Sequence, residues 1–211
     1  MAEGLVWGGE ASIATDFIER GMSPWPTDAV AQGLLTVSDN TAWAATLALT
    51  APEDHARDYL VVARGAAYGH VGDNWQWQAH AGVYVYPGGG PAYRAFDRAE
   101  AGLSAGYRDV ATLTLSALRM TGKPADDHLY PAAELSLRWP LSDHWTLAAG
   151  VGRSEVLRWP GVWYTYGDVG VEWQAGPWRA ALRQVGASDA ARPYMAGGND
   201  PRTTVSLGWQ F

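Results

Sequence analysis

Apolar and polar residues alternate with a period of two through nearly the whole chain, and almost no stretch has the period of an amphipathic helix. Successive side chains of a β-strand point to opposite faces, so this alternation is typical of strands with one apolar face. It is clearest from Thr203 to Phe211, where Val205, Leu207 and Trp209 share the face of Phe211. The alternation predicts an all-β fold.

Two kinds of connection separate the alternating stretches. Tight-turn sequences recur near Asp39, Asp73, Asp109, Asp143 and Pro177, and longer segments rich in Gly, Pro and charged residues lie between them. A sheet of antiparallel hairpins, with tight turns at one end and long loops at the other, fits this pattern. We expect one domain over residues 1–211 and twelve strands, or ten if one hairpin within 87–120 or 186–211 is miscounted. The expected strands are 12–20, 30–38, 42–50, 59–70, 75–86, 99–107, 110–120, 129–139, 145–153, 162–174, 178–185 and 203–211.

Composition narrows the classes of function. The chain is 47% hydrophobic and has 12 Trp, but only 18% of its residues are charged, against about 25% in average proteins. Its formal net charge of −7 argues against nucleic acid as a partner, because a nucleic-acid-binding face is normally basic. The absence of Cys excludes disulfides, thiolate metal sites and a cysteine nucleophile. No apolar run approaches the ~20 residues of a membrane-spanning helix.

The tryptophans gather at one end of the predicted hairpins. Seven of them fall on the apolar face of a strand and lie close to a tight turn or to the last residue of the chain. A ring of aromatic residues at one height is the interfacial girdle of a membrane barrel, whereas a soluble core would distribute such residues along its strands. The predicted girdle consists of Trp43, Trp75, Trp139, Trp145, Trp173, Trp178 and Trp209.

Charged residues in mid-strand fall on the opposite, polar face. On the apolar face, Arg119 and Arg153 occur only near the loop ends. A sheet with a lipid-facing side must close, because backbone groups in lipid must pair with one another. The pattern therefore predicts a closed antiparallel transmembrane β-barrel; a soluble β-barrel or sandwich that binds an apolar ligand is the less favoured alternative. The residues predicted to line the lumen are Asp16 and Arg20, which would face the same side of the first strand, and Arg64, His80, Glu100, Glu134, Arg138, Asp168, Glu172, Arg179 and Arg183.

Patterns that indicate catalysis or metal binding are weak. His70 and His80 fall on the polar face without a Ser in a recognisable arrangement, and no histidine has another at the spacings that ligate metals. The glycine run 88–90 has no strand-to-helix setting, so it does not predict a phosphate-binding loop. We therefore expect no enzyme activity, no catalytic residue, no cofactor and no metal site.

Both ends of the sequence resemble outer-membrane proteins. Residues 205–211 alternate and end in Phe211, and they resemble the carboxy-terminal signal by which the barrel-assembly machinery recognises its substrates. Residues 12–23 and 29–33 resemble the start of the TorF family of porins, which implies a proteobacterial outer-membrane barrel. The residues that carry this second resemblance are Asp16, Phe17, Arg20, Gly21, Gln32 and Gly33.

A charge-lined lumen predicts passive diffusion of small hydrophilic solutes or ions, with no covalent step. Paired charges that fill a narrow interior would instead make a structural or adhesive barrel with a sealed lumen, and twelve strands do not decide between the two. The expected partners are outer-membrane lipids, lipopolysaccharide, the barrel-assembly machinery and small polar solutes. The first residues lack the basic start and apolar core of a signal peptide, so we expect a mature form in the outer membrane of a Gram-negative cell.

Overall fold

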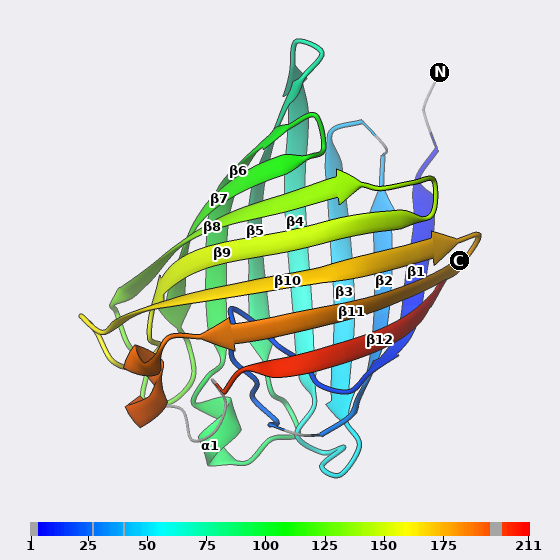
Figure 1. Cartoon of the computed structure of the whole chain (residues 1–211). Coiled ribbons are helices and arrows are strands. Elements are labelled where there is room, and N and C mark those ends of the chain that lie inside the picture. Colours follow the sequence, from blue (N-terminus) through cyan, green and yellow to red (C-terminus); the bar gives the residue numbers. More distant parts are fainter. Residues whose placement is uncertain (1–3, 27, 40, 195–199) are drawn as a thin grey trace.

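The computed structural model describes residues 4–26, 28–39, 41–194 and 200–211. The described residues form twelve strands of one closed barrel, in which each strand pairs antiparallel with its sequence neighbours and β1 pairs with β12 (Figure 1). This is the fold that the alternation predicts. The strands are β1 (Val6–Ala14), β2 (Val30–Ser38), β3 (Trp43–Pro52), β4 (Leu60–Val71), β5 (Trp75–Val85), β6 (Arg98–Tyr107), β7 (Ala111–Met120), β8 (Leu129–Pro140), β9 (Trp145–Glu155), β10 (Trp163–Ala175), β11 (Trp178–Ala187) and β12 (Arg202–Gln210).

Backbone torsion angles at the tight turns explain why the chain reverses there. Gly72, between β4 and β5, has a φ of 61°, and Gly176, between β10 and β11, has a φ of 56°. Positive φ costs glycine little, and it matches a short turn to the right-handed twist of the strands that it joins. Arg108 and Asp109 take the same conformation between β6 and β7. These turns hold the hairpins in register at one end of the barrel.

Longer connections lie at the other end, and two of them contain short helices. The loop between β5 and β6 contains α1 (Pro91–Arg94), and the loop between β11 and β12 contains the 3-10 helix η1 (Asp189–Tyr194). No helix in the described ranges is long and apolar enough to cross a membrane. The tight-turn end also holds the start of β1 and the end of β12, where the N–H of Gly9 donates to the carbonyl of Phe211 at 2.9 Å.

The outer surface of the barrel is apolar along the strands. Large aliphatic side chains such as Leu103 and Leu115 are more than half exposed. Of the seven tryptophans predicted to form the girdle, six are exposed and Trp173 is partly buried. Trp7, at the start of β1, is 63% exposed at the same end and adds to this ring. The apolar groups that a soluble barrel would enclose therefore lie outside.

The first strand is the one element that the sequence analysis misplaces. β1 spans Val6–Ala14 instead of 12–20, so Asp16 and Arg20 lie beyond the strand and do not share one of its faces. The register explains the shift, because β1 must reach Ser38 on β2 and Gln210 on β12 to close the barrel. Small residues dominate β1, which weakens its apolar alternation.

An apolar core of modest size lies at the loop end. Trp25, in the long segment between β1 and β2, is 2% exposed and packs with Leu60 and Tyr86. Met22 of the same segment packs with Val156, and Phe17 packs against the Trp25 cluster. The chain after β1 therefore folds inward at this end, as the blue segment in Figure 1 shows, instead of extending into solvent as a free loop.

Candidate functional site

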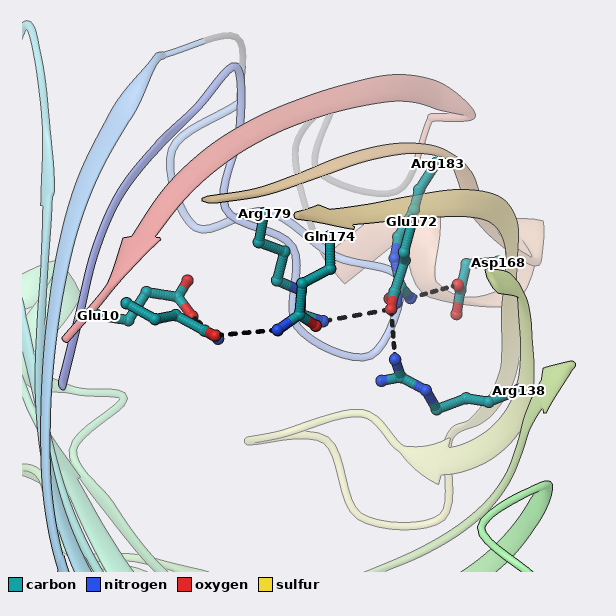
Figure 2. Close-up of polar contacts among 8 residues, drawn as sticks. Glu10, Arg138, Asp168, Glu172, Gln174, Arg179 and Arg183 are labelled. Carbon is teal, nitrogen blue, oxygen red and sulfur yellow. Dashed lines mark hydrogen bonds and ion pairs between the residues drawn. The ribbon is translucent and has the colours of Figure 1, made fainter. Parts of the chain in front are cut away.

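Five charged side chains of β8, β10 and β11 form one interior network, here called the arginine cluster. Glu172 accepts hydrogen bonds from Arg138 at 2.7 Å and from Arg179 at 3.3 Å. Arg183 donates to Asp168 at 2.7 Å and also pairs with Glu172. Figure 2 shows the side chains of Arg138, Arg179 and Arg183 converging on the carboxylate of Glu172, with Asp168 beside Arg183. Three guanidiniums from β8 and β11 thus meet at one buried carboxylate of β10.

The burial of the arginine cluster sets its electrostatic character. The Glu172 side chain is 4% exposed, whereas the Arg138 side chain is 52% exposed. Two carboxylates face three guanidiniums, so the cluster carries a formal excess of one positive charge and presents it through Arg138. Because guanidinium groups keep their charge at all ordinary pH values, this part of the interior stays positive.

Small residues on β9 make the cluster possible. Arg138 and Glu172 come from β8 and β10, which are separated by β9, and their register partners on β9 are Ala148 and Thr146. A Cβ at Gly150 of β9 would lie 2.6 Å from the carboxylate of Asp168. A larger side chain at this position would displace Asp168, so the glycine lets the cluster lie flat across the strand.

A line of hydrogen-bonded polar side chains runs from β10, which also carries Glu172 of the arginine cluster, to β1. The amide of Gln174 donates to Gln210 at 3.4 Å, and the amide of Gln210 donates to Glu10 at 3.1 Å. Figure 2 shows this line of contacts reaching Glu10 across the barrel seam. Sequence reasoning missed Glu10 because it placed the first strand too late to include it.

A second interior feature is the tight hairpin at residues 19–22, here called the lumen hairpin. The N–H of Glu19 donates to the carbonyl of Met22 at 2.8 Å, and the N–H of Met22 donates back at 3.0 Å. Arg20 has a φ of 50° and Gly21 a φ of 76°, so both central residues are left-handed, as a two-residue type I′ turn requires. Gly21, at the second central position, adopts the left-handed conformation easily, so the chain can form this turn.

The lumen hairpin is held by several walls of the barrel. Arg20 Nη2 lies 2.5 Å from Glu100 Oε1 on β6 and 3.1 Å from the hydroxyl of Ser116 on β7. Glu19 pairs with Arg98 at the start of β6. On the far side, a Cβ at Gly21 would lie 2.5 Å from the Cβ of Tyr166 on β10. The hairpin therefore spans the interior from β6 and β7 to β10.

The base of the lumen hairpin is fixed by polar contacts as well. Asp16 accepts a hydrogen bond from Ser23 at 2.6 Å and another from Arg202 of β12 at 2.7 Å.

Burial alone would raise the pKa of Glu19, but the charges of Arg98 and Arg20 and the hydrogen bond from Arg98 hold that pKa below its ordinary value. Glu19 is therefore ionised at neutral pH and keeps its ion pair.

Three cavities surround the lumen hairpin. One of about 260 Å³ lies toward the loops, among tyrosines and prolines. The second, about 390 Å³, borders the β10, β11, β12 and β1 walls, and the third, about 330 Å³, borders the β4 to β8 walls. The second and third share Ile18, Glu134 and Tyr166 as boundary residues, and the Tyr166 hydroxyl donates to Glu134 at 2.9 Å. Of the described residues, Arg20 alone lines all three.

The remaining residues predicted for the lumen lie along these cavities. Arg64, His80 and Glu100 line the third cavity, with the Nε2 atom of His80 4.0 Å from Glu100 Oε1. Sequence reasoning did not select Arg98 or Arg202, because each stands at the junction of a loop and a strand. Its expected strands begin at 99 and 203, one residue too late for either arginine.

In the part of the chain that the structure describes, the histidine–carboxylate pairs other than that of His80 lie at the loop end of the barrel. His55 Nδ1 lies 3.1 Å from Asp28, and His128 Nε2 lies 2.8 Å from Glu155. Within the same ranges, no group of three or more His, Asp or Glu residues is arranged to hold a metal ion. The charged interior is therefore the candidate functional site.

Comparison with known proteins places this architecture. No family model and no curated protein matches the sequence. Among solved structures, the chain is similar to the KdgM porin in complex with disordered oligogalacturonate, with a TM-score of 0.65 and 6% identity over 97% of this chain and 98% of that one. It is also similar to the NanC porin, with a TM-score of 0.58 and 10% identity over 98% and 99% of the two chains.

A third structure, LpxR from Salmonella typhimurium, has a TM-score of 0.50 and 11% identity, over 97% of this chain and 99% of that one. At these identities the likeness concerns the fold. The chain thus has the closed twelve-stranded barrel fold that outer-membrane porins such as KdgM and NanC share.

Proposed function

We propose that this protein is a porin-like barrel of the Gram-negative outer membrane through which small hydrophilic solutes or ions diffuse passively. The observation that carries the proposal is the contrast between an outer surface covered by exposed Leu, Val and Trp and an interior that contains the arginine cluster and three cavities. Such a barrel is stable only with lipid outside and polar groups inside. No catalytic step and no cofactor are part of this function.

The arginine cluster is the proposed selectivity element. Charged rings and clusters along a pore change the relative passage of anions and cations. Arg138 exposes half of its side chain to the interior, so it can contact a passing solute. One of the similar porins, KdgM, forms a complex with disordered oligogalacturonate. For this chain, we infer only small polar solutes, among which anions would meet Arg138 favourably.

Membrane assembly is a further part of the proposal. Outer-membrane lipids and lipopolysaccharide would contact the apolar belt and its girdle, and the barrel-assembly machinery would recognise the last strand, which ends in Phe211. Membership of the TorF family is proposed from residues 12–33 alone.

A sealed structural or adhesive barrel is the second candidate, and the lumen hairpin is the observation that favours it. Its ion pairs with β6 place a segment of chain across the interior. The two candidates differ in one measurable property, which is conductance.

Single-channel recording in planar bilayers tests the proposal. The protein would be refolded into detergent and checked by the heat-dependent gel shift of folded barrels before reconstitution. Discrete, reproducible conductance steps are expected for an open pore. A silent bilayer with correctly folded protein would contradict passive diffusion and support the sealed barrel.

A further inference from the structure

The lumen hairpin stands where the cavities of the interior meet. The first cavity, which lies toward the loops and is here called the mouth cavity, is on one side of the hairpin. The second and third cavities are deeper and lie on its other side, one beside β10–β12 and one beside β4–β8. Ile18 and Arg20 border both deeper cavities, and Glu19 and Arg20 border the mouth. A solute that moves from the loops toward the tight turns therefore passes this hairpin.

The hairpin is braced from several directions, which gives it a fixed position. Arg20 binds Glu100 and Ser116, whereas Asp16 binds Arg202 on the opposite side of the seam. The side chains of Asp16 and Glu100 are only 5% and 7% exposed, so these ion pairs are shielded from solvent. Shielded ion pairs are weakened by salt much less than exposed pairs are.

Arg20 is the side chain that closes the gap between the hairpin and the wall. The backbone of the turn touches β10 through Gly21, while the opposite wall, at β6 and β7, is reached only by the extended guanidinium of Arg20 and by the Glu19–Arg98 pair among the described contacts. Truncation of Arg20 would leave the turn in place but would join the mouth cavity to the third cavity along β6 and β7.

We propose that the lumen hairpin is the constriction of the solute path and that the Arg20 side chain, held by Glu100 and Ser116, sets its size limit. This inference rests on the proposed function as a diffusion channel, because it names the element that restricts that diffusion. Pore diameter and the charges at the narrowest point together determine which solutes pass. The Arg20 side chain narrows the path and also places a positive charge at its narrowest point.

The test compares the native chain with Arg20→Ala and with Arg119→Ala as the matched control. Arg119 pairs with Asp127 on the outer surface, where the two side chains are 58% and 94% exposed, so its removal deletes the same group outside the lumen. Each protein would be verified by the heat-dependent gel shift. The measurements are single-channel conductance and the swelling of proteoliposomes in neutral sugars of increasing size.

We expect Arg20→Ala to raise the conductance severalfold and to admit sugars that the native barrel excludes, whereas Arg119→Ala behaves as the native protein does. Equal conductance and an equal size limit in Arg20→Ala and the native protein would overturn the constriction and leave the diffusion channel intact. A silent native barrel with a conducting Arg20→Ala variant would overturn native diffusion but support the hairpin as the closing element. Silence of all three folded proteins would overturn both proposals.

A second variant keeps the test valid if Arg20→Ala does not fold. Glu100→Gln retains the size of the partner side chain but replaces an ion pair with a weaker neutral hydrogen bond. We expect larger and more variable conductance steps, because the guanidinium of Arg20 is then held less firmly. Steps identical to those of the native protein would count against Glu100 as the group that holds Arg20.

Discussion

Arg138 on β8 and Glu172 on β10 form an ion pair of 2.7 Å that lies across the strand between them. Glu172 is the nearly buried anchor of this pair, and Arg138 is its exposed member. The pair is therefore asymmetric: the negative charge is covered by three guanidiniums, while part of the positive charge remains available to the interior. Charge selectivity in this barrel should depend on the exposed member.

Neutralising Arg138 should change the ion preference of the pore. In Arg138→Ala the two carboxylates of the arginine cluster face two guanidiniums instead of three, so the formal excess of positive charge disappears. We expect the ratio of anion to cation permeability to fall severalfold. The reversal potential in a salt gradient measures this ratio, and the external Arg119→Ala variant is the control. An unchanged reversal potential in Arg138→Ala would remove the cluster as a selectivity element.

A charged residue on the outer face should block membrane assembly. Leu135 is 39% exposed on the apolar side of β8. A Lys or Arg facing the middle of the bilayer costs about 2–4 kcal/mol, and a carboxylate somewhat less. We expect Leu135→Glu to reduce the fraction of heat-modifiable protein in the outer membrane.

Gln78→Glu on β5 is the matched control for that substitution. Gln78 lines a fourth cavity, which it shares with Tyr68 and Ser104, so the substitution introduces the same group on the polar side. It should assemble normally. Equal assembly of the two variants would mean that the outer surface of β8 does not face lipid.

Gly21 should resist substitution. Its φ of 76° costs an L-residue roughly 1–2 kcal/mol, and an added Cβ would also meet Tyr166 at 2.5 Å. We expect Gly21→Ala to lower the free energy of unfolding by at least that amount, measured by denaturant unfolding in detergent. Gly33→Ala is the control, since a Cβ there has no neighbour within 4 Å. Similar unfolding midpoints for the two variants would contradict the strained turn.

Asp39 should make stability depend on acid pH. Its carboxylate accepts hydrogen bonds from the N–H groups of Ala42, Thr41 and Trp43, which lower its pKa from 3.8 to about 2. Because the pKa of Asp39 is lower in the folded state than in the unfolded state, its ionised carboxylate stabilises the folded protein fully at pH values above the unfolded-state pKa. This stabilisation is lost as the pH falls from about 4 to about 2.

The Asp39→Ala variant should therefore be less stable than the native protein at neutral pH, and the difference should shrink through that acid window. Thermal unfolding in detergent over a pH series measures it. Asp143→Ala removes a carboxylate from another tight turn at the same end and serves as the control. A difference between Asp39→Ala and the native protein that stays constant down to pH 2 would rule out this source of stability.

Eleven strands could be located from the sequence to within two residues at each end. Their alternation is imposed by two different environments, because one face must be apolar and the other polar. β1 could not be placed in this way, since Gly8, Gly9 and Ala11 carry too little side chain to mark a face. Register with β2 and β12 determines where it lies, and register is a property of the closed sheet.

For the lumen residues too, some features could be predicted from the sequence and others could not. Arg138, Glu172 and Arg183 could be assigned to the polar face from alternation alone, because they lie within regular strands. Arg20 and Glu100 could both be selected as lumen residues, but their pairing could not be predicted, since the two residues are 80 positions apart in the sequence. Gly21 was the local signal for a turn, and it lies directly after the expected strand 12–20, whose last residue, Arg20, is the first left-handed residue of the hairpin.

Pairing of β1 with β12 also determines which contacts can form only after the last strand has been added. Asp16 follows the first strand, and its partner Arg202 begins the last, 186 residues later. During synthesis the hairpin segment emerges early, yet this brace is missing until the final strand has joined the first. A chain halted before β12 would consequently lack both a closed wall and one of the contacts that hold the hairpin. Under the proposed function, the sealing of the seam and the completion of the barrier would thus be one event in the maturation of the barrel.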